Sequence, residues 1–587
     1  MLWKTKVVSL LVAVILVATV AADANAADET FEHAWNVANG TWVTDSNWNP
    51  SGPPTASDDI VVKNGGTATI GSGDVAVSDR AYIGYTGGNG TVTMTGGTFD
   101  LNQIRVSKAS AAGDNTGGDT TGTFNLSGGT VTVGEVQVGQ GGHGASGMNA
   151  STGYFNHSGG TVDFTAGGVL SVGTTGTGTY TLSGTGVVNG KTMQVGYGRT
   201  YYAEDGHSVG VFTQSAGTTV TADVSLDIGT GWDEIGNGTY NMQGGTLNIK
   251  GYGLNLGYAQ AGTDGGNEDQ VGTFNLSGGT VNMTAHIIMG DNAAGGQYNI
   301  NFSGGTLTDA AAGANLTVRG NSAVGATFTA SGGGTRTVDL AGTLTNNGVV
   351  KADGTTLNMK SFTAVANTID NGIAENNGWY AVNSGKLQLD DVAVATGAQS
   401  VNWGEDAADT SIDLVNSVRA QFDSVTTGGN LSVELWANDL APGTLANTWT
   451  TLGLWSIEDG TIVFDTSGTN DASLAFRYDE ENIVGNESDL RVWKWDASAS
   501  KWIIQHYTAD ATNNIITATG IVDSFDTGDM FAVFSQGWIT GDLDHDDDVD
   551  FADRQIFDGQ FGTHAPEPAT MSVLALGGLA LLRRRRK

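Results

Sequence analysis

A glycine-rich phrase recurs through the first half of the chain, and this repeat constrains the fold more than any other feature. One copy is GTFNLSGGTVTVGEVQVG, residues 122–139. A period of about 20 to 50 residues is typical of repeat architectures, in which each unit buries its apolar face by stacking on its neighbours. Successive copies are spaced by 32, 31, 25, 32, 28, 34 and 26 residues, counted at Gly97, Gly129, Gly160, Thr185, Gly217, Gly245, Gly279 and Gly305.

Within each copy, apolar and polar residues alternate in three short stretches. In the copy at 122–139 the apolar positions are Phe124, Leu126, Val131, Val133, Val136 and Val138. Alternation with a period of two is typical of β-strands that bury one face. We therefore expect an all-β fold whose main part is a parallel β-helix or solenoid of about eight coils, roughly 40 Å long at the usual strand spacing.

The repeat also predicts which residues stack on one another from coil to coil. The inner column is Val92, Phe124, Phe155, Tyr180, Phe212, Tyr240, Phe274 and Ile300, and the adjacent column is Met94, Leu126, His157, Leu182, Gln214, Met242, Leu276 and Phe302. We thus expect His157 and Gln214 to be packing residues in or near the core, and we do not assign His157 a catalytic role. A third strand ends in a glycine that turns a corner, at Gly139, Gly173, Gly196, Gly229, Gly257 and Gly290.

The composition excludes several classes of function. The chain has 61 acidic residues against 25 lysines and arginines, a formal charge of −36, so nucleic-acid phosphates and anionic lipids would repel it. There is no cysteine, which excludes disulfides and thiolate metal sites. The regular apolar pattern argues against a disordered polymer. The class that remains is a folded, acidic, multi-domain protein.

The first 26 residues have the pattern of a secretory signal peptide. Lys4 and Lys6 precede the apolar run Val7–Val20, and Ala24-Asn25-Ala26 offers a cleavage site between small residues. An apolar run of 14 residues is short for a membrane span, which argues against a retained anchor. We predict that the mature chain is exported.

Residues 27–78 contain three tryptophans and precede the regular repeats. Bulky side chains such as Trp42 and Trp48 are suited to covering the open end of a repeat stack, so we predict an N-terminal cap. The alternative to capping is that these tryptophans form platforms that bind sugar rings. The W-x(n)-N-W stretch before a glycine-rich strand series resembles the openings of repeat-containing bacterial surface proteins of the autotransporter-associated type.

The insertions after the corner glycines offer a candidate binding edge. Most of them are polar and glycine-rich, and they would project from one side of the stack. The aromatic residues there are Tyr197, Tyr201, Tyr202, Trp232 and Tyr258. Solvated loops without a ligand are the simpler interpretation.

Catalytic groups are not arranged convincingly in the repeats. A hydrolase needs two carboxylates about 5 to 9.5 Å apart, and Asp223 with Asp227, or Asp163, could be proposed, but no aligned pair recurs in adjacent coils. The basic residues that lyase chemistry requires do not recur at one strand position either. We predict that the protein is not an enzyme, and we name no catalytic or cofactor-binding residue.

After the repeats the pattern changes twice. Residues 79–325 hold the solenoid repeats, and 326–395 look like closing coils. Residues 396–537 lose the glycine repeat, carry half of the tryptophans and alternate between apolar and polar positions, which predicts a β-sandwich-like module. This part resembles the C-terminal β-module of bacterial exported proteins. A stalk is our interpretation, and carbohydrate binding is the alternative.

Residues 538–563 contain the strongest chemical motif. Six aspartates are spaced as the oxygen ligands of a Ca²⁺ loop, at Asp542, Asp544, Asp546, Asp548, Asp550 and Asp553, followed by apolar residues that could pack as a short helix. The segment resembles the dockerin calcium loop. Asp547 stands where the family has glycine, and there is one loop where cohesin-binding dockerins have two, so the resemblance implies calcium binding without cohesin docking.

Residues 564–587 end the chain with Pro566-Glu567-Pro568, an apolar run and RRRRK. The three parts in this order resemble the PEP-CTERM sorting signal. The resemblance implies recognition by an exosortase in the inner membrane of a Gram-negative bacterium, transient membrane contact through the tail, and removal of the tail. A permanent C-terminal anchor is the alternative.

Together these features predict an exported structural or adhesive protein of the cell surface or extracellular matrix. The alternatives are a polysaccharide-binding module and, last, a β-helix polysaccharide lyase or hydrolase. We expect Ca²⁺ as cofactor and, as partners, the sorting enzyme and an extracellular polysaccharide.

Overall fold

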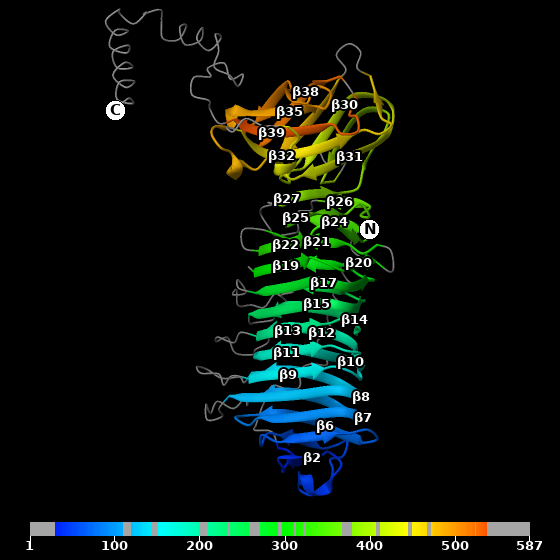
Figure 1. The fold of residues 1–587 in the computed structure, drawn as a ribbon, viewed down its shortest axis with the longest axis vertical. Coiled ribbons are helices and arrows are strands. Elements are labelled where there is room, and N and C mark those ends of the chain that lie inside the picture. Colours follow the sequence, from blue (N-terminus) through cyan, green and yellow to red (C-terminus); the bar gives the residue numbers. More distant parts are fainter. Residues whose placement is uncertain are drawn as a thin grey trace, which may run out of the picture.

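The structure is a computed structural model, and it describes residues 30–109, 119–141, 151–198, 208–231, 235–257, 270–290, 296–309, 313–320, 324–366, 378–406, 411–443, 449–465, 471–522 and 524–536. These residues form an all-β protein with a parallel sheet, as the alternation in the sequence predicts. The predicted signal peptide, calcium loop and sorting signal lie outside the described residues. The parallel strands are stacked along the long axis of the molecule, and an antiparallel module lies at one end (Figure 1).

Most strands of the stack belong to the repeats. At the N-terminal end are β1 (His33–Trp35), β2 (Asn39–Thr41), the 3-10 turn η2 (Asp45–Asn47), β3 (Trp48–Asn49), β4 (Asp59–Val62) and β5 (Thr67–Ile70). The repeats follow as β6 (Val75–Tyr85), β7 (Gly90–Lys108), β8 (Thr120–Gln140), β9 (Ser151–His157), β10 (Thr161–Thr174), β11 (Thr177–Leu182), β12 (Val187–Gly198), β13 (Ser208–Gln214), β14 (Thr219–Gly231), β15 (Gly236–Ile249), β16 (Gly253–Leu256), β17 (Val271–Met283), β18 (Ile287–Met289), β19 (Gly296–Phe302), β20 (Thr306–Asp309) and β21 (Leu316–Val318).

The C-terminal end of the stack and the antiparallel module complete the described chain. The stack ends with β22 (Val324–Ala330), β23 (Thr335–Asp339), β24 (Thr343–Asn346), β25 (Val349–Asn358), β26 (Ala364–Ala366) and β27 (Trp379–Gln388). The module comprises β28 (Val392–Val394), β29 (Gly397–Trp403), β30 (Val418–Thr427), β31 (Gly429–Trp436), η3 (Asn438–Leu440), β32 (Trp449–Glu458), β33 (Val463–Phe464), β34 (Ala472–Arg477), η4 (Glu480–Asn482), η5 (Glu487–Asp489), β35 (Leu490–Asp496), β36 (Lys501–Ile504), β37 (Tyr507–Asp510), β38 (Ile515–Ile521) and β39 (Met530–Gln536).

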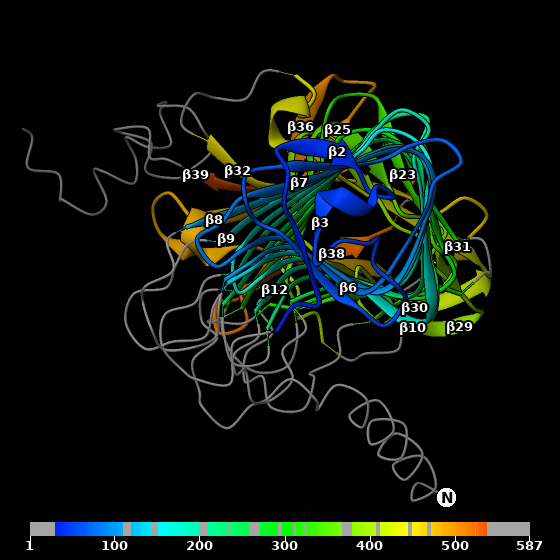
Figure 2. The ribbon, with the colours of Figure 1, turned by 90° about the horizontal axis from the view of Figure 1, so that it is seen from below.

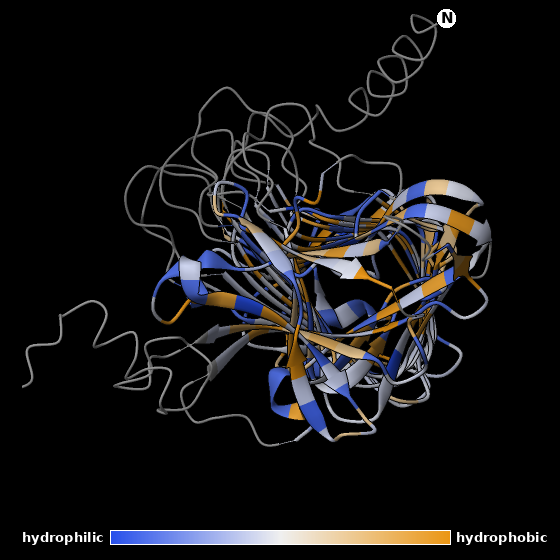
Figure 3. Ribbon diagram, turned by 90° about the horizontal axis from the view of Figure 1, so that it is seen from above, coloured by the Kyte–Doolittle hydropathy of each residue, from blue (hydrophilic) through white to orange (hydrophobic). Residues whose placement is uncertain are grey.

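Both predicted inner columns are confirmed by the strand register. Parallel pairing aligns the aromatic residues from Phe124 to Phe274 in order, and His157 aligns with Leu126 and Leu182. Ring centroids from Phe155 to Tyr180 and from Tyr180 to Phe212 lie 4.6 and 4.7 Å apart, close to the strand spacing. Hydrophobic and hydrophilic residues are interspersed along the strands (Figure 3), and in strands such as β11 buried and partly exposed residues alternate. Seen along the long axis, the strands of successive repeats overlie one another (Figure 2).

The corner glycines are confirmed as positions that a side chain would crowd. Gly173, for example, has a φ of +73°, and an added Cβ would lie 2.3 Å from the Val209 carbonyl oxygen. Opposite it stands Gly178, whose added Cβ would lie 2.3 Å from the Gly173 nitrogen. In the turn counted at Thr185, the residue with the left-handed conformation is Gly184, with a φ of +60°.

Parallel pairing continues beyond the eight predicted repeats on both sides. β2 pairs with β5 and β5 with β7, so the segment predicted as a cap contributes two further levels to the stack. At the other end, β22 pairs with β25 and β25 with β27. Trp42 and Trp48 are 1% and 2% exposed, with ring centroids 4.9 Å apart, so these two residues fill the end of the core and cannot act as sugar platforms.

The antiparallel module consists of two facing groups of strands. One group contains β31, β32, β39, β35 and β36 and is joined to the stack, because β27 pairs antiparallel with β31. The other is the sheet β29-β30-β34-β38-β37, with β33 paired to β30. The Trp455 ring of the first group lies 4.7 Å from the Phe476 ring of the second, so the core runs between them.

Candidate functional site

Most residues of the two binding sites predicted from the sequence lie outside the described residues. This holds for the predicted calcium ligands Asp542, Asp544, Asp546, Asp548, Asp550 and Asp553, and for Tyr201, Tyr202, Trp232 and Tyr258 of the candidate binding edge. Tyr197 is described, is partly buried and is aligned with Thr174 and Thr230. Within the described part of the chain, no group of three or more His, Asp or Glu side chains is placed to hold a metal ion.

The outer faces of the repeats carry columns of threonine and asparagine. On the first strand of successive repeats, the column Asn125, Asn156, Thr181, Thr213, Asn241, Asn275 and Asn301 is in register. Its amides bond along the stack, with Asn275 Nδ2 donating to Asn241 Oδ1 at 2.8 Å and Asn301 Nδ2 donating to Asn275 Oδ1 at 2.8 Å. These side chains therefore connect one repeat to the next.

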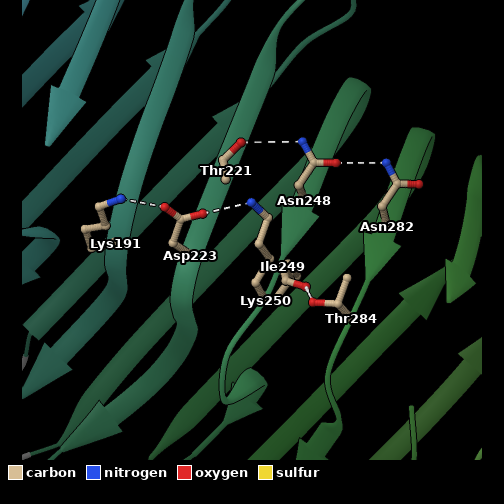
Figure 4. A network of polar contacts seen from close by, with 8 residues as sticks. All are labelled: Lys191, Thr221, Asp223, Asn248, Ile249, Lys250, Asn282 and Thr284. Atoms are coloured by element: carbon tan, nitrogen blue, oxygen red, sulfur yellow. Dashed lines mark hydrogen bonds and ion pairs between the residues drawn. The ribbon is translucent and has the colours of Figure 1, made fainter. Parts of the chain in front are cut away.

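A second polar network lies on the next strand of the repeats (Figure 4). Asp223 bridges two lysines of neighbouring repeats, with Lys191 Nζ at 2.6 Å and Lys250 Nζ at 3.0 Å. The hydrogen bonds from Lys191 and Lys250 hold the pKa of Asp223 below its usual value. Beside them, Asn282 Nδ2 donates to Asn248 Oδ1 at 2.9 Å. Asp223 is therefore an ionised link between repeats and is poorly suited to act as a base.

The other two carboxylates considered from the sequence are also engaged. Asp163 accepts a hydrogen bond from Asn189. Asp227 accepts from Asn255 Nδ2 at 2.8 Å and Ser225 Oγ at 3.0 Å, and burial raises its pKa to about 6 despite these bonds. In the register Asp163 aligns with Asn189, and Asp227 with Gln194 and Asn255, so these two acids are not neighbours in one column.

His157 and Gln214 are core residues, as predicted. They are 1% and 0% exposed. Because a carbonyl can only accept, His157 Nε2–H donates to the Gly160 oxygen at 3.1 Å, and Nδ1 accepts from the Tyr180 hydroxyl at 2.9 Å. Burial lowers the pKa of His157 to about 4, so the ring is neutral at pH 7. The Tyr240 hydroxyl likewise donates to Gln214 Oε1 at 2.7 Å.

The sequence contained a signal for these pairs that the column prediction missed. In the inner column, tyrosine replaces phenylalanine at Tyr180 and Tyr240, the two repeats that follow His157 and Gln214. Each polar residue in the adjacent column is therefore matched by a hydroxyl one repeat later. Another missed signal is the glycine two residues before each inner aromatic, such as Gly178, which faces the corner glycine.

Tryptophans gather on the outer face of the antiparallel module. Trp436, Trp493, Trp495 and Trp502 are partly buried and pack on Leu454, Met530, Ala532 and Phe534. By contrast, Trp403 and Trp455 are 1% and 0% exposed and belong to the core. The sequence could not divide the tryptophans between the two faces, because that depends on the register of antiparallel strands.

One family model matches the chain, and the match lies at the C-terminus. The model is the PEP-CTERM protein-sorting motif, and it matches residues 564–587. The chain carries a PEP-CTERM sorting signal. This motif implies an exported protein that is sorted to the cell surface in Gram-negative bacteria by an exosortase system. No curated protein and no solved structure matches the chain. Among the described residues, no helix is long and apolar enough to cross a membrane.

Proposed function

We propose that the chain is a non-enzymatic structural or adhesive protein of the cell surface or extracellular matrix, built on a β-solenoid rod. The observation that carries this proposal is the unbroken parallel pairing of one repeat with the next. Such a stack is long and stiff because each repeat contacts mainly its neighbours and buries a continuous core. The sorting signal indicates that the protein is exported and sorted to the cell surface.

The outer faces support a structural role more than a catalytic one. The asparagine side chains of the outer columns form hydrogen bonds along the stack, and the ionised Asp223 forms ion pairs with Lys191 and Lys250. Retaining or inverting hydrolysis requires two carboxylates at a defined separation, one of them free to accept a proton. Asp163, Asp223 and Asp227 each have hydrogen-bond partners within the repeats.

We further propose that a signal peptide at 1–26 directs export, that an exosortase reads Pro566-Glu567-Pro568 and that the tail is removed. Residues 538–563 would bind Ca²⁺ through Asp542, Asp544, Asp546, Asp548, Asp550 and Asp553, a set of oxygen ligands suited to this hard cation. Calcium there would stiffen the joint between the antiparallel module and the processed tail.

Cell fractionation with turnover assays tests the proposal. In a Gram-negative host with an exosortase, the wild-type chain is expected outside the cell or on its surface, shortened at the C-terminus. A variant with Pro566, Glu567 and Pro568 replaced by alanine is expected to stay unprocessed with the membrane fraction. Purified protein is expected to release no product from neutral or acidic polysaccharides. Release of oligosaccharides, or normal processing of the variant, would contradict the proposal.

A further inference from the structure

The outer face of the sheet β31-β32-β39-β35-β36 has an unusual concentration of tryptophan. Register places Trp436 opposite Leu454, Leu454 opposite Ala532 and Ala532 opposite Trp493, so all four side chains lie on one face. Trp495 lies opposite Trp502 on the same face. We call the set Trp436, Trp493, Trp495 and Trp502 the tryptophan face. With strands about 4.8 Å apart, Trp436 and Trp493 are separated by about 14 Å.

The rings of the tryptophan face are held in place before any ligand arrives. Trp502 Nε1 donates to the Pro442 carbonyl oxygen at 2.9 Å. The Trp502 ring lies 5.5 Å from the Trp495 ring and 5.3 Å from the Phe534 ring, measured between centroids. Fixed aromatic rings lose little conformational freedom on binding, which favours a binding role.

The face stays partly open to solvent and continues into an exposed apolar residue. Ile504 on β36, which lies opposite Trp493, is 48% exposed. The module's core does not need these side chains, because Trp403, Trp455 and the facing phenylalanines already fill it. A cluster of apolar side chains outside the core marks an interaction site in many soluble proteins.

Lys386 and Arg491 lie beside the face, and each contacts a neighbouring side chain. Lys386 Nζ pairs with Glu434 at 2.8 Å and lies 5.0 Å from the Trp436 ring centroid. Arg491 lies over the Tyr507 ring at 5.3 Å. A polyanion would meet cations that already contact other side chains, on a chain with a net charge of −36, and would gain little from them. An uncharged partner fits this surface best.

The size of the patch argues against a second protein chain as the partner. A stable protein interface needs about 800 Å² from each partner, whereas these rings are already partly buried on their own sheet. A sugar ring is smaller and presents an apolar C–H face with hydroxyl groups at its edge. Partly exposed indoles beside polar groups provide the matching surface, apolar with a few polar contacts.

We propose that the tryptophan face binds an uncharged polysaccharide, with sugar rings stacked on Trp495 and Trp502. This inference rests on the proposed surface role, and it specifies the partner's chemistry. It also moves the binding site away from the edge predicted at Tyr197, Tyr201, Tyr202, Trp232 and Tyr258. The tryptophan face adjoins the stack, because β27 places Lys386 opposite Trp436, and Thr356 of β25 lies beside Lys386 in the same sheet.

Affinity electrophoresis of the full exported chain tests this proposal. Gels contain either uncharged polymers, namely hydroxyethylcellulose, galactomannan and arabinoxylan, or the acidic polymers alginate and polygalacturonate. We expect at least one uncharged polymer to retard the protein and the acidic ones not to. Trp495→Ala and Trp502→Ala are expected to weaken binding about tenfold or more, as buried aromatic anchors do. Trp502→Phe, which keeps a ring, is expected to retain most of the affinity.

Tyr252→Ala is the matched control, because Tyr252 is an aromatic residue of the repeats that is 57% exposed. Its binding is expected to equal that of the wild type. The proposal is overturned if no uncharged polymer retards the protein, or if both tryptophan variants bind like the control. It is also overturned if ultracentrifugation shows a dimer that these variants dissociate. Circular dichroism checks folding, and fractionation tests the surface role separately, so the two proposals can fail independently.

Discussion

A polar side chain enters the inner columns of the repeats only together with a tyrosine in the next repeat. His157 bonds to Tyr180, and Gln214 bonds to Tyr240. Elsewhere the residue pair is apolar, as with Leu126 followed by Phe155. The reason is that a buried donor or acceptor without a partner costs about 1 to 3 kcal/mol. Stacking between repeats therefore depends on matched pairs of residues.

The first prediction concerns one of these pairs. Tyr180→Phe removes the donor to His157 Nδ1 and is expected to lower the free energy of unfolding by about 1 to 3 kcal/mol. The double variant His157→Leu/Tyr180→Phe recreates the apolar pair found at Leu126 and Phe155, and should recover most of the loss. Chemical denaturation measures both. A single variant as stable as the wild type would argue against the pairing.

The second prediction is a pH effect of His157. Burial lowers its pKa from 6.5 to about 4, so the unfolded chain binds more protons than the folded one between these values. The stabilisation that the neutral His157 ring provides is complete above pH 6.5. The free energy of unfolding then falls by up to about 3 kcal/mol as the pH drops to 4. His157→Gln, which mimics Gln214, is expected to show a smaller fall in denaturation curves between pH 7 and 4. An unchanged fall would exclude His157 as its source.

The third prediction concerns Glu405, a 3% exposed residue near the end of the stack. Its Oε1 accepts from Leu414 N at 2.6 Å and Ser417 Oγ at 2.9 Å, which fixes the segment whose Val415 carbonyl accepts from Tyr380 N. Burial raises the pKa of Glu405 from 4.5 to about 7. The folded chain then holds the extra proton, so stability decreases as the pH rises from 4.5 to 7.

Glu405→Gln is expected to reduce this decrease, measured by thermal unfolding between pH 4.5 and 8. The effect has the opposite sign to that of His157 where the two ranges overlap, so each is measured as a difference between variant and wild type. A variant with the same slope as the wild type would show that Glu405 does not titrate in this range.

At the level of elements, pairs of glycines set how closely the strands turn at each corner. Gly173 has a φ of +73° and faces both Gly178 and the Val209 carbonyl oxygen. The sequence predicted the corner, because glycine recurs at one strand end. The sequence did not predict the facing glycine, because Gly178 belongs to β11 whereas Gly173 belongs to β10.

The fourth prediction compares two glycines with similar φ. Gly173→Ala adds a Cβ 2.3 Å from a backbone oxygen, whereas Gly167, with a φ of +79°, has nothing within 4 Å of its added Cβ. We expect Gly167→Ala to cost about 1 kcal/mol, from backbone strain alone. Gly173→Ala should cost about 3 kcal/mol or more, because backbone must also shift. Equal losses in urea denaturation would mean that the corner is not close-packed.

Predictability from sequence differs between the two kinds of element. The repeats were predictable, because a column such as Phe124, Phe155 and Tyr180 is in register with a recurring turn. For the antiparallel module the sequence predicted strands but not which side chains each strand buries, because its strands are irregularly spaced and a shift of one residue exchanges core for surface. That exchange decides whether a tryptophan resembles buried Trp455 or partly exposed Trp502.

For the whole molecule, the candidate sites separate into two groups. The sorting signal and the proposed calcium motif could be read from the sequence, because each is a short local motif near the C-terminus. The family match covers residues 564–587. The tryptophan face and the Glu405 contact arise from residues brought together by strand pairing, with no local motif to reveal them. In the proposed rod, the number of repeats sets how far the antiparallel module lies from the N-terminal end of the stack.

The measurement that tests the rod most directly is the maximum dimension in solution, by small-angle X-ray scattering, of the wild type and of a chain lacking residues 124–211. This deletion removes three levels of the inner column, namely Phe124, Phe155 and Tyr180, and places Phe212 next to Val92, where Phe124 stood. The proposed stack predicts a folded protein shorter by about 14 Å with an unchanged cross-section. An unchanged maximum dimension, or a compact particle in either case, would contradict it.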